Sequence, residues 1–532
     1  KQFWNIKEQH QDCIILFRMG DFYETFEKDA ETTSEILGIA LTKRSNGAAS
    51  SVPLAGFPYH ALNQHLYKLL KAGHRVAICE QVEDPKEAKG IVRREVVEVV
   101  SPGTTIADNY LDNNFNNYLC CVYNNGKTIG FSLLDHSTGE FTSTEIYPNE
   151  FNDIVSRYNI SEILVLESQE KIFKKYNSIQ NIVMNFIPDW VNDYDYSNEI
   201  LCNHFKVKNM KGFGFRKKSC SIISSGMIMY YIRENFKTRI NHINNLKSLF
   251  YQKNMQLDYY TIRNLELFNP LLSNNKKSTL IYILDKTVTA SGSRLLKNWL
   301  ARPLLDKILI DNRLNHVQDF FDDDNFIRDT RLLLKKTYDI ERIVAKVASN
   351  KSNPVDIINL STSLKILNDF KNLIPKKSFF IKKLFKNIIN SKKIISIIDN
   401  TLSKDASINM NKGNFIKDGF SSELDDLRSI SNDANEWMLD YQNKLRSETS
   451  ISSLKISFNK VFGYYIDVTK THAHKVPDYF IKKQTLVNNE RFFTNELKDF
   501  EDKILNAEYK INELESKIFN NLCQIIINIS ND

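Results

Sequence analysis

The sequence lacks any long hydrophobic run. Its most apolar stretches, such as residues 523–529, fall far short of the ~20 residues that a membrane-spanning helix requires. No apolar secretory segment opens the chain either. The sequence therefore predicts no membrane partner, and we expect a location in the cytoplasm.

Cysteine pairs with metal-binding or redox spacing are also lacking. The seven cysteines are an odd number, contain no CxxC pair and lie mostly inside apolar runs that are typical of strands. This pattern excludes a CxxC zinc site, and it indicates buried thiols in a reducing cytosol rather than a disulfide framework. The cysteines are Cys13, Cys79, Cys120, Cys121, Cys202, Cys220 and Cys523.

No complete phosphate-binding loop of the GxxxxGK[ST] type is present. The nearest match ends in the GKT sequence at residues 126–128, but Cys121 occupies the position of the first glycine that such a loop requires. The preceding Asn124-Asn125 lies between two β-rich runs, which indicates a hairpin turn. We therefore expect this chain to bind no cofactor.

What is present is enough material for several folded domains. Hydrophobic residues make up 42% of the 532 residues and charged residues 25%, both near the averages of globular proteins. The length exceeds the roughly 250–300 residues at which single cores stop growing. The net charge of +7 permits a polyanionic partner without requiring one. Lys1 stands where a Met would begin a chain, and Asp532 follows a long helical pattern, so we expect a piece of a longer protein.

The first half of the chain has the pattern of two α/β domains. We predict one over residues 1–105, a turn-rich linker over 106–117 and a second domain over 118–245. The predicted strands lie at residues 13–17, 76–79, 96–100, 118–123, 128–134 and 163–166, and the predicted helices at 62–73 and 222–236.

The second half is predominantly helical. Within a first helical part, predicted over 246–423, helical periodicity covers residues 278–300, 307–321 and 328–348. The basic stretch at 376–393 is predicted to be a solvated helix face.

Two heptad-like seams dominate the end of the chain. One runs from Leu424 to Leu445 and the other from Phe493 to Ile525, with β-like runs at 455–458 and 464–468 between them. We therefore predict two long paired helices that carry a small β-rich tip. At ~1.5 Å per residue the first helix alone would reach roughly 30 Å.

The sharpest local motif is GDFYE at residues 20–24, directly after the first predicted strand. From the residues alone, Gly20 and Asp21 indicate a turn, and two adjacent aromatics are most often core residues. However, five segments together resemble, in order and spacing, the mismatch-binding domain of the MutS family. They are RMGDFYE at 18–24, LTKR at 41–44, LAGFPYH at 54–60, VAICEQ at 76–81 and SPGT at 101–104.

The resemblance continues along the rest of the chain. Residues 258–266 and 284–303 resemble the start of the family's helical core, and residues 458–466 and 484–502 resemble its clamp and the helix that returns from it. It implies a mixed α/β mismatch-binding domain, a ribonuclease H-like connector, a helical core with long lever helices over 246–423 and 491–532, and a β-rich clamp inserted at 424–490. The implied function is recognition of mispaired or slipped bases in duplex DNA at the start of mismatch repair.

The resemblance also assigns roles to single residues. In this family the Phe of a Phe-x-Glu motif wedges beside the mispaired base from the minor groove, and the Glu hydrogen-bonds that base; Phe22 and Glu24 match these positions. Whether Glu24 is protonated on DNA stays open. The expected contacts to the DNA backbone or minor groove are Lys43, Arg44, Lys460, Lys482, Lys483 and Arg491.

For the full-length protein the resemblance implies further machinery. It includes an ATPase domain that uses ATP and Mg²⁺, a homodimer and a MutL-type partner, in a bacterial protein associated with the nucleoid. None of the residues of that machinery is found in this sequence.

Two alternatives stay open at this point. A structure-specific nuclease would need carboxylates such as Asp135 and Glu140, which we instead expect to be solvated turn residues. A junction-binding paralogue would have no reason to keep Phe22-x-Glu24. His472 and His474 have strand-like spacing but no third ligand, so no metal site is predicted.

Overall fold

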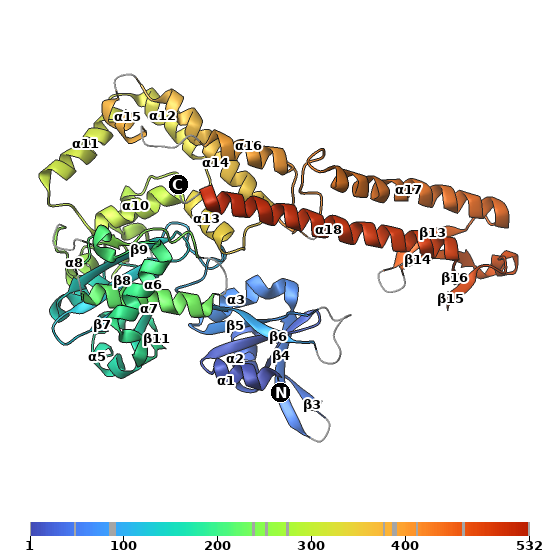
Figure 1. Cartoon of the computed structure of the whole chain (residues 1–532), viewed down its shortest axis with the longest axis horizontal. Coiled ribbons are helices and arrows are strands. Elements are labelled where there is room, and N and C mark those ends of the chain that lie inside the picture. The colour runs from blue at the N-terminus through green and yellow to red at the C-terminus, as the bar shows by residue number, and fades with distance from the viewer. Residues whose placement is uncertain are drawn as a thin grey trace. The chain divides into compact units, whose positions relative to one another are not determined.

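The computed structural model describes residues 2–46, 49–83, 92–216, 218–236, 240–249, 254–272, 276–375, 378–385, 391–410, 413–459 and 463–529. It divides into two compact units, and Figure 1 labels the helices and strands along the chain. The first unit contains Lys1–Ser352, Thr362–Asn390 and Ile527–Asp532, and the second contains Asn353–Ser361 and Ser391–Ile526. Within the described residues, no helix has both the length and the apolar character needed to cross a membrane.

The first unit begins with a six-stranded mixed sheet whose strand order is β3-β4-β2-β1-β5-β6. Helices α2 and α3 cover one face, where Tyr23 and Phe57 are buried, and α1 covers part of the other face through Phe3. The elements are α1 Gln2–Gln9, β1 Cys13–Met19, β2 Phe22–Phe26, α2 Glu27–Leu37, β3 Thr42–Asn46, β4 Ala49–Pro58, α3 Leu62–Lys71, β5 Arg75–Gln81 and β6 Arg94–Val100.

A second six-stranded sheet follows, in the order β11-β10-β7-β8-β9-β12. The β7–β8 hairpin confirms that the GKT sequence lies in a turn, with Gly126 at φ +91°. Helix α7 lies so close to β8 that a Cβ on Gly130 would meet the Cys220 carbonyl oxygen at 2.1 Å. The elements are β7 Tyr118–Asn124, β8 Ile129–Asp135, β9 Glu140–Ile146, α4 Phe151–Val155, β10 Ile160–Leu166, α5 Glu170–Phe173, β11 Val183–Ile187, α6 Tyr194–Phe205, α7 Cys220–Asn235 and β12 Lys247–Ser248.

Helices make up the rest of the first unit and confirm the predicted helical periodicity, and the helix Pro354–Leu373 runs from the second unit into the first. Two of the periodic spans are interrupted, because new helices start at side-chain caps: Thr289 accepts from the Gly292 N–H, and Asp339 accepts from the Arg342 N–H. The helices are α8 Tyr259–Asn264, α9 Leu280–Leu284, α10 Ala290–Ala301, α11 Lys307–Phe321, α12 Asp324–Leu334, α13 Ile340–Ala348, α14 Pro354–Leu373 and α15 Phe379–Phe385. Part of the predicted basic face at 376–393 lies outside the described residues.

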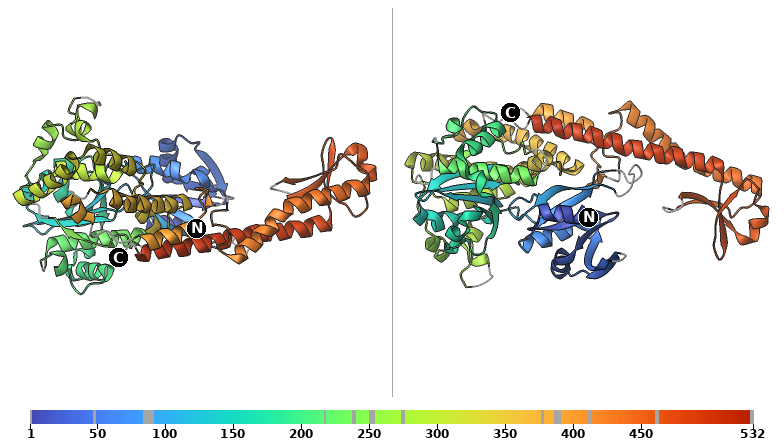
Figure 2. Two further views of the ribbon diagram at one scale, coloured as in Figure 1. Left: turned by 90° about the horizontal axis from the view of Figure 1, so that it is seen from above. Right: turned by 60° about the horizontal axis from the view of Figure 1, so that its bottom comes forward.

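The second unit is built on two long antiparallel helices that lie side by side (Figure 2). The Trp437 ring of α17 stacks on the Phe500 ring of α18 with 3.6 Å between centroids, and the Tyr441 hydroxyl bonds to that of Thr494 at 2.7 Å. This confirms the predicted pairing. The elements are α16 Lys392–Thr401, α17 Ser422–Thr449, β13 Lys455–Asn459, β14 Gly463–Thr469, β15 Ile481–Thr485, β16 Asn489–Phe493 and α18 Asn495–Ile529.

In the sequence between α17 and α18 lie the four strands of an antiparallel sheet, in the order β13-β14-β16-β15. The sequence predicted β13 and β14 but not β15 and β16. The spacing of His472 and His474 is typical of a strand, but both residues lie in a 3₁₀ helix, Lys470–Lys475.

Candidate nucleic-acid interface

The GDFYE motif forms the tight hairpin between β1 and β2. Met19 pairs with Phe22, so only Gly20 and Asp21 form the turn, and Gly20 takes the positive φ of +58° that glycine tolerates best. Successive side chains of a strand point to opposite faces. Accordingly Tyr23 is 2% exposed and Phe22 is 47% exposed. The general expectation that adjacent aromatics are core residues is therefore correct for Tyr23 and wrong for Phe22.

Phe22 is exposed because the helix that covers its face of the sheet does not cover this end. Phe3 of α1 packs on Phe26 and Phe17, at centroid distances of 4.8 and 6.0 Å. Beyond them the face ends in Phe22 and its strand neighbours Met19 and Pro58, which are half-buried. Sequence reasoning did not single out Met19 and Pro58 as site residues. The pairing register of β2 with β1 and β4 would have indicated Met19 and Pro58, because both are paired with Phe22.

Glu24 lies on the same face as Phe22, one residue pair further along the strand. It is half-buried and pairs with Gly56 of β4. A Cβ on Gly56 would lie 3.4 Å from the Glu24 Cγ and 3.0 Å from the Tyr23 carbonyl oxygen. The glycine therefore leaves room for the carboxylate side chain beside the exposed aromatic.

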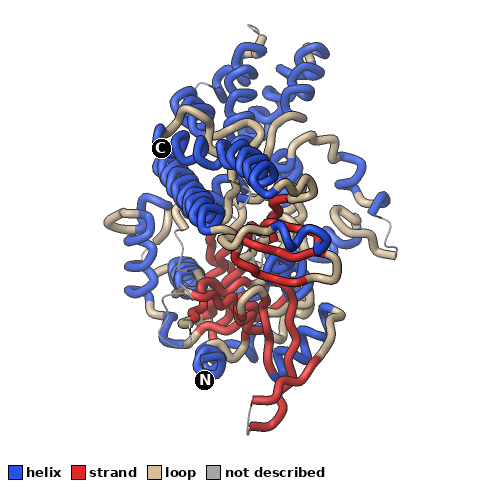
Figure 3. Tube along the Cα trace, turned by 90° about the vertical axis from the view of Figure 1, so that its right-hand side faces the viewer, coloured by secondary structure: helices blue, strands red, loops and turns tan. Residues whose placement is uncertain are grey.

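The two cations predicted nearby lie on the β3–β4 hairpin, which extends beyond the rest of its sheet (Figure 3). Lys43 is exposed and pairs with Pro53, so the register puts it on the face of Tyr23, opposite Phe22. Arg44 pairs with Val52, but its side chain is outside the described part. The structure therefore does not bring Lys43 onto the face of the Phe22–Glu24 pair.

The other predicted cations belong to the four-stranded sheet of the second unit, except Lys460, which lies outside the described residues. On β15, the exposed Lys482 forms an ion pair with Glu490 at 2.6 Å, and the Lys483 ammonium lies 5.3 Å from the Phe493 ring centroid. On β16, Arg491 stacks on Tyr465 at 4.2 Å and donates to the Gln484 side chain at 2.9 Å. Three cations thus gather on two neighbouring strands.

Neither carboxylate of the nuclease alternative is fully solvated, which corrects that expectation: Asp135 is buried and Glu140 is half-buried. Asp135 is fully buried and accepts hydrogen bonds from the Asn116 side chain at 2.8 Å and from the Ser137 hydroxyl at 2.7 Å. Tyr118 donates to Glu140 at 3.0 Å, and burial raises the pKa of Glu140 above its ordinary value. Within the described ranges, no three His, Cys, Asp or Glu side chains gather in a way that could hold a metal ion.

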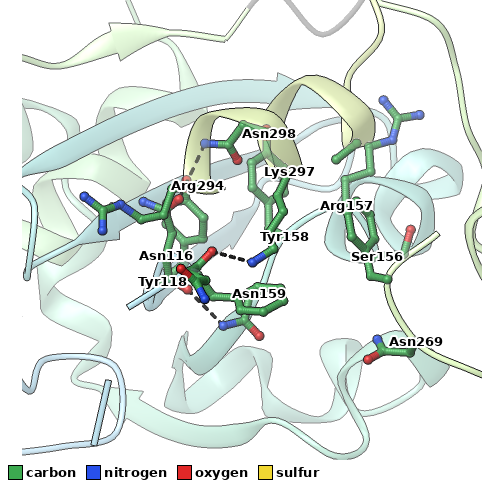
Figure 4. Close-up of a pocket in the computed structure, with 14 residues that line it drawn as sticks. Asn116, Tyr118, Ser156, Arg157, Tyr158, Asn159, Asn269, Arg294, Lys297 and Asn298 are labelled. Atoms are coloured by element: carbon green, nitrogen blue, oxygen red, sulfur yellow. Dashed lines mark hydrogen bonds between the residues drawn. The ribbon is translucent and has the colours of Figure 1, made fainter. Parts of the chain in front are cut away.

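A polar pocket of about 110 Å³ lies in the first unit, where β7 and α10 approach each other (Figure 4). Its cations already have partners. Arg294 pairs with Asp339 at 2.6 Å, and Lys297 donates to the Asn114 carbonyl at 2.7 Å. Asn159 donates to the Asn116 carbonyl at 2.9 Å. The pocket is thus lined by side chains that hold the chain segments together.

The fold defines a multidomain protein in which two α/β domains precede a helical region with a small antiparallel sheet. Family models match the same three parts: MutS domain I over residues 1–109, MutS domain II over 117–244 and MutS domain III over 260–531. The chain therefore belongs to the MutS family.

Proteins named DNA mismatch repair protein MutS are similar to this chain over nearly its whole length. The one from Flavobacterium psychrophilum is 42% identical over 523 residues, which are 98% of this chain and 60% of that protein. The one from Salinibacter ruber is 40% identical over 98% of this chain and 58% of its own length. The chain thus spans about three fifths of the length of these relatives.

Proposed function

We propose that this chain recognises mispaired or slipped bases in duplex DNA, with Phe22 as a wedge and Glu24 as the reader of the mispaired base. One observation carries the proposal: Phe22 is 47% exposed, whereas the adjacent Tyr23 is 2% exposed. Burial of a large aromatic stabilises a fold, so an aromatic left in water at the tip of a hairpin supports a role in binding.

The physics of DNA deformation supports this role. An apolar wedge in the minor groove partly unstacks a base step and kinks the duplex, and a mispair makes that deformation cheaper than it is in Watson–Crick DNA. A carboxylate near phosphates weakens binding in general, so Glu24 beside Phe22 suits discrimination better than affinity. Lys43 and Arg44 would add contacts to the DNA backbone or minor groove at the β3–β4 hairpin.

We propose finer roles for the other parts by their similarity to the family. The sheet of β13 to β16 would be a clamp at the end of lever helices α17 and α18, where Lys460, Lys482, Lys483 and Arg491 contact phosphates. The second sheet would be a ribonuclease H-like connector, with boundaries near residues 118 and 245.

The activity of the whole protein is also part of the proposal, because the chain spans about 60% of its relatives' length. We propose an ATPase domain that binds ATP and Mg²⁺, a homodimer, and a MutL-type partner. The protein would act in the bacterial cytoplasm at the nucleoid.

The test is Phe22→Ala compared with Tyr23→Ala, both made in the full-length protein. Loss of the exposed ring should abolish the preference for a mismatch, an effect of about 5- to 150-fold, and leave binding to perfect duplex nearly intact. Truncation of the buried Tyr23 should instead cost about 3–5 kcal/mol of folding free energy. Affinities for matched and mismatched duplexes, together with melting curves, measure both effects. A folded Phe22→Ala variant that still prefers mismatches would defeat the proposal.

A further inference from the structure

Arg18 contacts the Phe22 hairpin on the face of the sheet opposite Phe22. Arg18, on β1, lies on the opposite face of the sheet from Phe22 and pairs with Tyr23. Its guanidinium stacks 4.0 Å from the Tyr59 ring centroid and 5.5 Å from that of Tyr23. It also forms an ion pair with Glu80 of β5 at 3.8 Å. One side chain thus joins β1, β2, β5 and the end of β4.

The same arginine contacts the turn itself. The Arg18 Nε–H donates to the Gly20 carbonyl, and the Tyr59 N–H donates to the Asp21 carbonyl at 2.8 Å. The carbonyls of both turn residues between Met19 and Phe22 therefore accept hydrogen bonds. Further hydrogen bonds hold Arg18 and its ion-pair partner Glu80 in place. Arg94 donates to the Arg18 carbonyl at 2.6 Å, and the Tyr23 hydroxyl donates to Glu80.

A wedge gains from such a support. An aromatic that must enter a base stack loses less conformational entropy when its backbone is already fixed, and an immobilised side chain is worth a modest part of the binding free energy. Only a planar guanidinium can stack on two rings while it also donates along the chain, so lysine is not an equivalent residue here.

We propose that Arg18 is a positioning residue for mismatch discrimination, which fixes the Gly20–Asp21 turn so that Phe22 is presented in one orientation. The inference rests on the proposed function of Phe22. Arg18 acts through Phe22 and touches no DNA.

The experiment measures matched and mismatched duplex affinities for four variants of the full-length protein: Arg18→Lys, Phe22→Ala, the double variant, and Arg93→Lys as control. Arg93 is an exposed arginine of the same domain that pairs with Glu95. Arg18→Lys should lower mismatch preference about 2- to 10-fold with unchanged binding to perfect duplex, whereas Arg93→Lys should change neither. In the Phe22→Ala background, Arg18→Lys should alter neither affinity.

The outcomes separate the two proposals. Retained mismatch preference in Phe22→Ala would overturn the proposed function itself. Lost preference in Phe22→Ala with full preference in Arg18→Lys would overturn only the positioning role. Weaker binding to both duplexes when Arg18→Lys is added to Phe22→Ala would show direct DNA contact and also overturn it. If Arg18→Lys lowers the melting temperature, Tyr59→Leu decides, because it removes the stack from a side chain that is itself exposed. Full preference in Tyr59→Leu would then count against the role.

Discussion

Lys482 and Lys483 are neighbours on β15, and the ion pair of Lys482 lies at the surface. Lys482 is half-exposed, and its ion pair with Glu490 is the kind of surface pair that contributes ~0–1 kcal/mol. A DNA phosphate can therefore replace Glu490 at little cost. Changing both lysines to Gln should weaken binding to perfect and mismatched duplex equally, because phosphate contacts carry no sequence information. The slope of log affinity against log salt should fall by up to about two.

The matched control changes the same amount of charge elsewhere. Lys171 of α5 and Lys174, which directly follows α5, are exposed, and Lys174 pairs with Glu170 at 2.5 Å. Their double change to Gln should leave the salt slope as it is. Equal slopes for the parent protein and the β15 variant would remove Lys482 and Lys483 from the interface.

Sequence reasoning reached Phe22 and Glu24 because their motif resembles one of the MutS family, whereas the residues alone favoured two core aromatics. It did not reach Met19 and Pro58, which flank Phe22 across strands, because strand register depends on pairing between distant segments. Lys43 lies on the opposite face of the sheet from Phe22 for the same reason. The sequence pattern shows that Lys43 is on a strand, but the pairing with β4 determines which face it occupies.

The long helices were predictable for a different reason. Heptad spacing is a strong and local signal, so the α17–α18 seam followed from the sequence. Helix α17 has 28 residues, which at ~1.5 Å each give about 42 Å rather than the expected 30 Å. Strands β15 and β16 were missed because polar residues such as Lys482, Lys483 and Asn489 dilute their apolar alternation.

One ion pair in that seam is buried. Arg428 of α17 contacts Glu515 of α18 at 2.5 Å, and Glu515 has no exposed surface. The same guanidinium donates to the Ile416 carbonyl at 2.8 Å. Arg428→Ala leaves the carboxylate buried without its cation, so the free energy of unfolding should fall by roughly 3–5 kcal/mol. Urea denaturation measures the change.

Lys444 and Glu496 provide the control, because they join the same two helices at 3.2 Å but are half-exposed. Lys444→Ala should cost less than about 1 kcal/mol. The apolar replacement R428M/E515L should recover most of the loss seen in Arg428→Ala, since both charges are then absent. Equal costs for Arg428→Ala and Lys444→Ala would contradict the argument.

The irregular stretch at 101–117 joins the parts of the first unit by contacts that no local pattern reveals. It has neither helix nor strand, but Ile106, Leu111 and Asn117 are buried. Arg342 of α13 donates to the Phe115 carbonyl at 2.9 Å, and buried Glu162 of β10 accepts from the Gly103 N–H at 2.8 Å. The burial of Asp135 was missed for the same reason, since its partner Asn116 belongs to this stretch.

One buried histidine bonds to this stretch, and a second buried histidine bonds to the first. His136 donates through Nδ1 to the Thr104 carbonyl at 2.7 Å, and His242 donates through Nε2 to the His136 carbonyl at 2.9 Å. Burial lowers the pKa of His136 to about 4 and that of His242 to about 3. Lys351 lowers the pKa of His136 further. His136 and His204 lower the pKa of His242 further, whereas Asp135 raises it.

The first unit should therefore lose stability as the pH falls. In the unfolded chain both histidines take up protons near pH 6.5, whereas in the folded chain they stay neutral down to about pH 4. The unfolded state then binds more protons, so the stability that is fully present above pH 6.5 is lost as the pH falls below it. Each histidine contributes a slope of about 1.4 kcal/mol per pH unit.

The measurement is the free energy of unfolding in urea at pH 7, 6 and 5, for the parent chain, His242→Gln and His60→Gln. Between pH 6 and 5 the parent should lose about 1.4 kcal/mol more than His242→Gln, because glutamine can still donate to the His136 carbonyl but takes up no proton. His60 is exposed, so His60→Gln should follow the parent. If the free energy of unfolding falls equally with pH in His242→Gln and in the parent, protonation of the buried His242 does not cause the loss of stability.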